Sequence, residues 1–161
     1  MDRIASFDVD HRNIVPGVYI SRIDGDMTTY DLRTRKPNTG ELMSNAVMHS
    51  TEHLFATIIR NSEIKDQVGY FGPMGCQTGY YLLVREANNT QVIEVIKQTL
   101  RDIISYDGEM PGMSEVECGN YRNLDVNLAK EDCKRYYEAI KDITEKDLRY
   151  PTGNSIDFKE R

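Results

Sequence analysis

The sequence lacks tryptophan and any long hydrophobic run, and it is poor in histidine and cysteine. Its 161 residues have a mean hydropathy of −0.57 and a formal charge of −6. No apolar run approaches the ~18 residues that a membrane span needs, and residues 1–15 contain no apolar segment typical of a secretory signal. Positive charge is scattered rather than clustered, which argues against nucleic-acid binding. We therefore expect a cytoplasmic protein that binds neither membranes nor nucleic acids.

The length favours a single domain, because ordinary domains hold roughly 100–200 residues. We expect residues 1–161 to form this domain, with residues 151–161 as a loose polar tail. Three cysteines are an odd number, and the spacings of Cys76, Cys118 and Cys133 match no disulfide framework. Free thiols in a reducing compartment are the better interpretation, and the charged residues around Cys133 predict a position at the surface or at the edge of the core.

Local patterns predict a mixture of strands and helices that do not alternate. Strands are predicted at residues 18–23 and 28–33, joined by an Asp-Gly turn, and at residues 67–71 and 80–85. The sequence further predicts helices and helical turns at residues 41–62, 90–106 (capped by Thr90), 114–117, 125–142 and 144–148. This order predicts an α+β fold.

The segment His-Ser-Thr-Glu-His at residues 49–53 is the strongest chemical signal in the chain. His49 and His53 are four residues apart, so their imidazoles lie one turn apart on one helix face and can reach a single cation. Glu52 lies about 60° around the helix from His49, at ~100° per residue, where it flanks the cation. Imidazole suits zinc and ferrous iron, and Cys118, in a capped turn beside Gly119, is a candidate third ligand.

Spacing alone leaves other interpretations open. HxxEH is also the signature of inverted zinc peptidases, in which the glutamate is the base and a distant carboxylate, here Glu131, completes the site. A non-catalytic metal-binding module is a further alternative, in which Cys76 serves only for packing. Against that stands the setting of Cys76 in a glycine-rich turn, which can present a thiol to a cleft as acid, base or nucleophile.

Together these motifs resemble the S-ribosylhomocysteine lyase (LuxS) family, which makes the precursor of autoinducer-2. The resemblance covers nearly the whole chain in order: Ser6-Phe7, Asp10-His11, Tyr30-Asp31-Leu32-Arg33, Pro37-Asn38, residues 49–56, residues 73–80 and Cys118-Gly119. It implies an antiparallel sheet of about four strands covered on one face by helices. It also implies a homodimer whose two active sites lie at the subunit interface.

The resemblance also implies the roles of individual residues. One divalent metal per subunit, Fe²⁺ with Zn²⁺ or Co²⁺ as substitutes, would be held by His49, His53 and Cys118. Cys76 and Glu52 match the acid–base pair. Ser6, His11 and Arg33 match contacts to the sugar, and Arg60 matches a contact to the amino-acid end of the substrate.

The implied reaction cleaves S-ribosylhomocysteine to homocysteine and 4,5-dihydroxy-2,3-pentanedione. A metal on the carbonyl and hydroxyl oxygens would acidify the adjacent C–H, which allows two aldose–ketose shifts followed by β-elimination. No redox change is required, so the metal is expected to act only as a Lewis acid.

The sequence departs from the family pattern at two places. Tyr70-Phe71-Gly72 stand where the family usually has an aspartate and a serine before Pro73, in the segment expected to recognise the substrate's amino group. Thr34 follows Arg33 where an aromatic residue is frequent. Arg33 and Arg60 also fit ordinary salt-bridge roles. Because the metal and acid–base positions are intact, we expect an active, divergent member.

Overall fold

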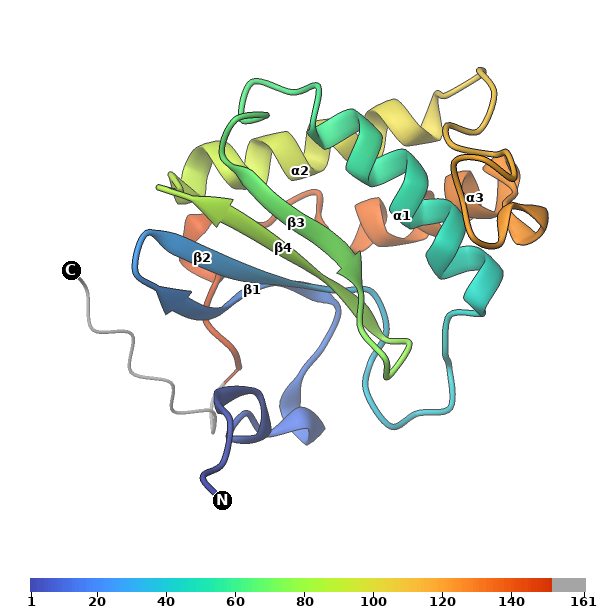
Figure 1. The fold of residues 1–161 in the computed structure, drawn as a ribbon. Helices are drawn as coiled ribbons and strands as arrows, with labels where there is room; N and C mark the ends of the chain where they lie inside the picture. Colours follow the sequence, from blue (N-terminus) through green and yellow to red (C-terminus); the bar gives the residue numbers. More distant parts are fainter. Residues whose placement is uncertain (152–161) are drawn as a thin grey trace.

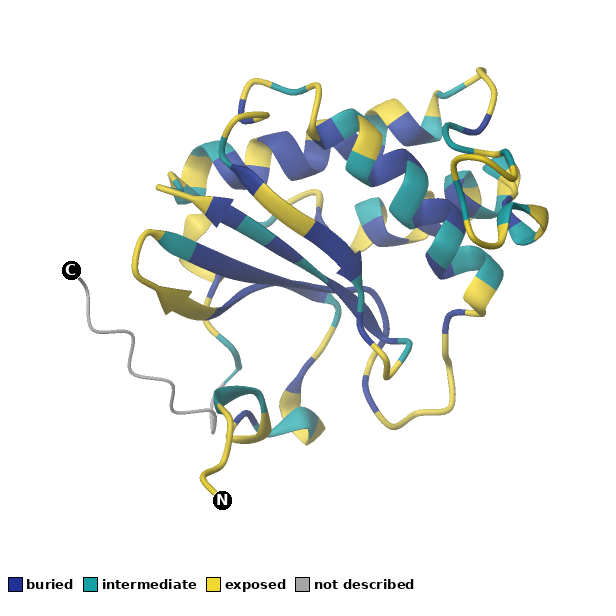
Figure 2. Ribbon diagram, viewed as in Figure 1, coloured by how far each residue is buried: buried dark blue, intermediate teal, exposed yellow. Residues whose placement is uncertain are grey.

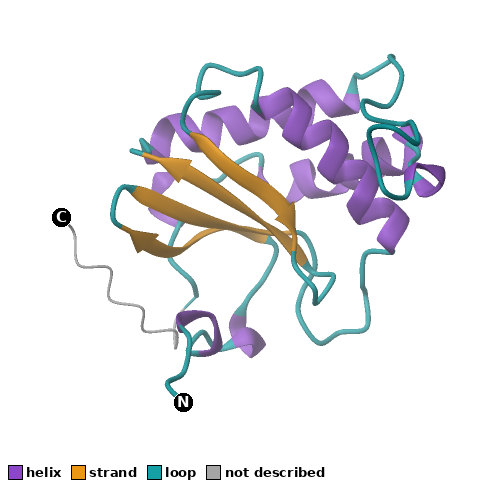
Figure 3. Cartoon of the chain, viewed as in Figure 1, coloured by secondary structure: helices purple, strands orange, loops and turns teal. Residues whose placement is uncertain are grey.

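The fold is α+β, with one antiparallel sheet covered on one face by helices (Figures 1 and 3). The structure is a computed structural model, and it describes residues 1–151. The sheet has the order β1-β2-β4-β3 and consists of β1 (Gly17–Asp24), β2 (Met27–Arg33), β3 (Val68–Pro73) and β4 (Gly79–Arg85). The helices are α1 (Asn45–Ile59), α2 (Asn89–Ile104) and α3 (Val126–Ile140). The predicted fold class is confirmed.

The helix that carries the two histidines is shorter than the predicted helix 41–62. It begins after Ser44, whose side chain accepts a hydrogen bond from the backbone N–H of Val47. The helix ends at its C-cap residue, Arg60. Hydrophobic spacing alone could not show that Met43 packs into the core from the preceding loop.

The other two helices are capped by side chains at their first turns. Asn88, not Thr90, caps α2, because the Asn88 side chain accepts from the N–H of Gln91; the predicted cap is wrong by two residues. Asp125 caps α3, and its own N–H donates to the Ser50 hydroxyl of α1 at 2.9 Å. This bond fixes the start of α3 against the middle of α1.

Two short segments match the predictions in part. Residues 114–117 form a turn rather than a helix, in which the N–H groups of Glu117 and Cys118 both donate to the Ser114 carbonyl. A 3-10 helix over Glu145–Asp147 lies within the predicted last turn 144–148, and Thr144 caps it in a capping box that was not predicted from the sequence. The predicted loose tail lies outside the described residues except for Pro151.

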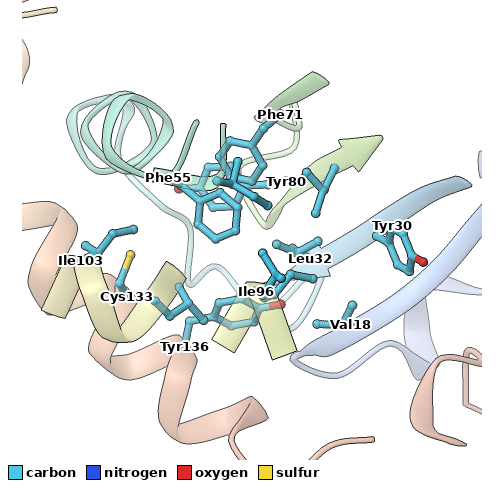
Figure 4. Close-up of a cluster of buried hydrophobic side chains, with 14 of the residues drawn as sticks. Val18, Tyr30, Leu32, Phe55, Phe71, Tyr80, Ile96, Ile103, Cys133 and Tyr136 are labelled. Carbon is cyan, nitrogen blue, oxygen red and sulfur yellow. The ribbon is translucent and has the colours of Figure 1, made fainter. Parts of the chain in front are cut away.

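The core lies between the sheet and the helices (Figure 2). Three aromatic rings, Phe55, Phe71 and Tyr80, stack there with centroids 4.2 and 5.1 Å apart (Figure 4). Cys133 is 2% exposed, so its predicted place at the surface or core edge is wrong. The reason is that Asp132 beside it also points inward and pairs with buried Arg35, so a charged neighbour did not mark a surface position.

The N-terminal segment lies against the other face of the sheet, below it in Figure 1. Val9, Ile14 and Tyr19 form a small buried cluster there, and Tyr150 stacks on Tyr19 at 4.9 Å. Among residues 1–151, none of the helices has both the length and the apolar character that crossing a membrane would require.

Candidate active site

The first half of α1 presents both histidines on one face. His49 and His53 are partly buried, and their rings lie edge to face with centroids 4.7 Å apart. This is the geometry expected of residues four apart on a helix. Both imidazoles therefore point toward the same volume.

Cys118 reaches that volume from the loop between α2 and α3. Its Sγ lies 3.3 Å from His49 Nε2, and donor atoms of His49, His53 and Cys118 all lie within 4.8 Å of one another. Tetrahedral ligands at ~2.0–2.3 Å from zinc or a similar ion stand roughly 3.5 Å apart. The separations thus fit one metal ion, as the sequence predicted.

The outer contacts of the two imidazoles leave their metal-facing nitrogens free. His49 Nδ1 lies 2.7 Å from Asn123 Oδ1, and His53 Nδ1 lies 2.8 Å from the Pro111 carbonyl. Both partners are acceptors, since the Asn123 amide nitrogen itself donates to Asn45 Oδ1. Each Nδ1 therefore carries the hydrogen and each Nε2 keeps a lone pair, which is the usual arrangement of metal-binding histidines.

The loop that supplies the Pro111 carbonyl passes very close to His53. Gly112 has a φ of +71°, and a Cβ placed on it would lie 3.0 Å from His53 Nδ1. A side chain would strain the backbone and press on the imidazole. Glycine at this position lets the loop lie against the ring.

The sequence offers two carboxylates for this site, Glu52 and Glu131. Glu52 is partly buried beside the histidines, and within residues 1–151 its carboxylate has no hydrogen bond or ion pair. It is therefore available to a substrate. Glu131, the third ligand of the peptidase alternative, is exposed on α3 and is not part of the cluster.

The second candidate group, Cys76, lies in the turn between β3 and β4. Its side chain is exposed. The next residue, Gln77, has a φ of +65°, which a non-glycine residue rarely adopts. Gln77 is held there by its N–H to the Met74 carbonyl and by its side-chain amide to the Met43 carbonyl, at 3.0 and 2.8 Å.

A buried ion pair lies behind Cys76. Arg33 and Asp31 are 2% and 1% exposed, and their closest atoms are 2.6 Å apart. Burial lowers the pKa of Arg33, but the pairing with Asp31 outweighs this and keeps that pKa above its usual value. Arg33 also donates to Thr78 Oγ1 at 2.8 Å, and its Nη1 lies 4.0 Å from Cys76 Sγ.

The remaining predicted site residues, His11, Ser6 and Arg60, lie in three places. His11 and Cys76 line one cavity of about 420 Å³, which the loop before α1 also borders. Ser6 lies in the short 3-10 helix Ala5–Phe7 of the N-terminal segment. Arg60 lies at the end of α1, where it donates to the carbonyls of Val68 and Gly69 on β3.

The β3–β4 turn and the start of α1 lie at the same end of the molecule (Figure 1). His49, His53 and Cys118 form one group, and His11, Arg33 and Cys76 form another. The cavity beside Cys76 has none of the three candidate ligands in its wall.

Sequence reasoning missed the residues that support both groups. Asn123 and the Pro111 carbonyl hold the histidines, and no spacing rule relates either residue to α1. Thr78 lies in the glycine-rich turn of Cys76, but only the fold shows that it contacts Arg33. Tyr70 and Phe71, in the divergent segment, are accounted for by packing, because Phe71 is a core residue and the Tyr70 ring lies over Gly72.

Comparison with known proteins gives one consistent result. A family model described as S-ribosylhomocysteinase (LuxS) matches residues 4–147. The S-ribosylhomocysteine lyase of Finegoldia magna is 41% identical over 156 residues, which cover 94% of this chain and 99% of the relative. Those of Desulfotalea psychrophila and Borreliella burgdorferi are 40% and 36% identical, and each alignment covers 94% of this chain and 100% of the relative.

Proposed function

This chain belongs to the S-ribosylhomocysteinase (LuxS) family, and on that premise we propose how its residues cleave S-ribosylhomocysteine. The protein is a carbon–sulfur lyase that releases homocysteine and the precursor of autoinducer-2. The observation that carries the assignment is the match over residues 4–147, together with the cluster of His49, His53 and Cys118.

His49, His53 and Cys118 hold one divalent metal, for which Fe²⁺ is our first assignment and Zn²⁺ or Co²⁺ the substitutes. The bound metal supplies Lewis-acid chemistry, because it makes a C–H beside a coordinated carbonyl more acidic. The hydrogen bonds to Asn123 and Pro111 support this role, since they fix both imidazoles before the metal binds.

Cys76 and Glu52 move the protons. Each aldose–ketose shift removes a proton from one carbon and returns one to its neighbour, which a thiolate on an exposed turn can do. Glu52, whose carboxylate has no partner within residues 1–151, exchanges the hydroxyl protons. After the second shift, one carbon separates the carbonyl carbon from the carbon that bears sulfur. Loss of a proton from that middle carbon forms a C=C bond and expels the homocysteine thiolate.

Substrate binding is assigned to both faces of the sheet. His11 borders the cavity beside Cys76, which supports its assignment to the sugar. Arg33 is assigned to the sugar by the resemblance alone, because in the structure it is buried and bound to Asp31 and Thr78. Ser6 belongs to the same N-terminal segment. Arg60 is assigned to the amino-acid end of the substrate.

We assign a homodimer in which a second copy completes the site. Apolar side chains remain exposed around the Cys76 cavity and the N-terminal segment, including Phe7 at 65% and Leu42 at 51%. Such exposed apolar groups indicate an interface. The whole chain would act as one catalytic domain in each subunit.

A reducing compartment, the cytoplasm, suits this chemistry. Cys76, Cys118 and Cys133 are all free thiols in the structure. Two of them must stay reduced for the site to work, one as a proton carrier and one as a ligand.

The direct test incubates Fe²⁺- or Co²⁺-loaded protein with S-ribosylhomocysteine and titrates the released thiol. We expect one homocysteine per substrate, and expect Cys76→Ala to release none while keeping its metal. Well-folded, metal-loaded protein that releases no thiol would overturn the assignment. Full activity of Cys76→Ala would refute the role of Cys76 alone.

A further inference from the structure

We propose that Thr78 is a positioning residue for Cys76, and that its hydroxyl donates a hydrogen bond to the Cys76 sulfur and favours the thiolate. The inference rests on the proposed function, in which Cys76 carries protons. It adds a residue to which no role has yet been assigned. The observation behind it is the contact chain that runs from Arg33 through Thr78 to Cys76.

The direction of the hydrogen bonds follows from the chemistry of the two neighbours. Thr78 is 3% exposed, and its Oγ1 lies 2.8 Å from Arg33 Nη1 and 3.0 Å from Cys76 Sγ. A guanidinium only donates, so Thr78 Oγ1 accepts from Arg33. Arg33 does not use the single hydroxyl hydrogen of Thr78, and the proposal assigns that hydrogen to the sulfur.

A fixed donor favours the charged form of the sulfur. A thiolate can only accept, whereas a neutral thiol has a hydrogen of its own to place. Hydrogen bonding to the charged form of an acid stabilises that form. The Thr78 hydroxyl is also nearer to the sulfur than the Arg33 guanidinium is, because Arg33 Nη1 is 4.0 Å from Cys76 Sγ.

Arg33 cannot turn away from Thr78. Its Nε and Nη2 donate to the two carboxylate oxygens of Asp31 at 3.1 and 2.6 Å, and the Tyr150 hydroxyl donates to the same carboxylate at 2.7 Å. The contacts that lead from Asp31 through Arg33 to Thr78 are therefore held in place by buried groups. This holds the Thr78 hydroxyl oxygen between Arg33 Nη1 and Cys76 Sγ.

Other ionisable groups also face the turn. His11 shares the cavity wall with Cys76, and Tyr81 lies on β4 nearby. Burial, Asp31 and Cys76 all raise the pKa of Tyr81, against a smaller lowering by Arg33. None of these groups contacts the Thr78 hydroxyl within residues 1–151, so a change at Thr78 reports on the sulfur.

The test compares Thr78→Val, which removes the hydroxyl at nearly constant volume, with Thr78→Ser, which keeps it. Metal-loaded protein is treated with iodoacetamide, and alkylation of Cys76 is followed by peptide mass spectrometry. We expect Thr78→Val to react about tenfold more slowly at pH 7, the loss of one hydrogen bond to a charged group. Its rate-against-pH profile should move to higher pH, and Thr78→Ser should stay within about twofold of wild type.

Two results would overturn the proposal. One is wild-type alkylation of Thr78→Val, and the other is equal slowing in the valine and serine variants, which would indicate packing alone. Thr78→Ala removes the same hydroxyl and serves if the valine variant does not fold. Alkylation needs no substrate, so a failed lyase assay with an intact alkylation pattern would count against the proposed function only.

An independent observation concerns the core behind α1. Thr51 Oγ1 and Tyr80 OH are fully buried, and among the described residues neither has a partner with ordinary hydrogen-bond geometry. Thr51 nevertheless lies close enough to Tyr80 and Cys133 to offset part of the rise that burial causes in the pKa of each. Both border a cavity of about 10 Å³ whose wall also includes Cys133 and Asp132. Figure 4 shows the Cys133 side chain on the side of α3 that faces the stacked rings.

We infer that this cavity holds one ordered water. A volume of ~10–15 Å³ is enough for a single water, provided that two or more polar groups can bind it. Two buried hydroxyls without partners are unfavourable, and a bridging water would supply a hydrogen bond to each of them. Because Thr51 lies between His49 and His53 on the opposite face of α1, the water would tie that turn to β4.

A crystal structure at high resolution decides this inference. We expect a peak within hydrogen-bond distance of both Thr51 Oγ1 and Tyr80 OH, and its loss in the double variant Thr51→Val with Tyr80→Phe. Tyr30→Phe is the matched control, because the Tyr30 hydroxyl donates to Asn89 instead and should leave the peak unchanged. An empty cavity in the wild type would overturn the inference.

Discussion

The two reactive groups of this protein are supported in different ways. The candidate metal-binding cluster has neutral hydrogen bonds behind it, with Asn123 and the Pro111 carbonyl holding the histidines of α1. Cys76 depends on charge, because a buried Arg33–Asp31 pair lies behind its turn. The difference indicates that metal affinity and thiol reactivity can be changed separately. Binding needs correctly aimed lone pairs, whereas a thiolate needs nearby positive charge and donors.

Among the variants, we expect Cys118→Ala to separate metal affinity from the reactivity of Cys76 most clearly. Loss of a ligand should weaken metal binding by more than the ~100-fold that changes outside the ligand shell reach. Alkylation of Cys76 should stay at the wild-type rate. Metal content and competition with a chromophoric chelator measure the first effect.

Cys133→Ala is the control for the removal of a thiol, since burial raises the pKa of Cys133 and keeps it a neutral core residue. This control should lose stability but keep its metal. Stoichiometric metal in Cys118→Ala with unchanged affinity would contradict the assignment of the third ligand.

Asn123→Ala should also weaken metal binding, but by less than Cys118→Ala. Without the Asn123 carbonyl oxygen the His49 ring loses its orientation, and we expect metal affinity to fall about 10–100-fold. Chelator competition measures the loss, and Asn127→Ala, an exposed asparagine on α3, is the control. Equal affinity in the two variants would show that the bond to His49 Nδ1 does not matter.

Some of the residues behind these two predictions could be predicted from the sequence, and others could not. The pairing of His49 with His53 follows from helical spacing, and the four strands follow from turn residues and β-branched runs. Asn123 could not be found in this way, because it is 74 residues from His49 and the two meet only when α3 packs on α1. Cys133 was misplaced for a similar reason: its charged neighbour Asp132 has a buried partner, Arg35, 97 residues away.

Arg60→Met should act on the substrate rather than on either reactive group. If Arg60 binds the amino-acid end, KM should rise about tenfold with kcat unchanged, the loss of one charge-assisted hydrogen bond. Arg85→Met is the control, because Arg85 is an exposed arginine paired with Asp26 on the same sheet. Arg60 also donates to two β3 carbonyls, so lower stability with unchanged KM would show that its role is structural.

Alkaline pH should lower the free energy of unfolding, because buried tyrosines lie behind both regions. This effect is smaller than those of the substitutions. Burial raises the pKa of Tyr80 behind α1, and burial together with Asp31 raises that of Tyr150 behind Arg33. The unfolded chain releases these protons near pH 10, while the folded protein keeps them. The stabilisation is therefore fully present below about pH 10 and is lost above it, by about 1 kcal/mol per tyrosine at pH 10.5.

Urea unfolding at about pH 8 and pH 10.5 measures this loss. Tyr150→Phe should reduce the difference between the two pH values, since it removes one of the titrating groups. An unfolding free energy that stays constant or rises with pH would contradict the sign.

The most direct test of the separation between the two groups is the absorption spectrum of the Co²⁺-loaded protein. We predict a sulfur-to-cobalt charge-transfer band in the wild type, the same band in Cys76→Ala, and no such band in Cys118→Ala. A band that survives in Cys118→Ala, or that disappears in Cys76→Ala, would contradict the assignment of one thiol to the metal and the other to proton transfer.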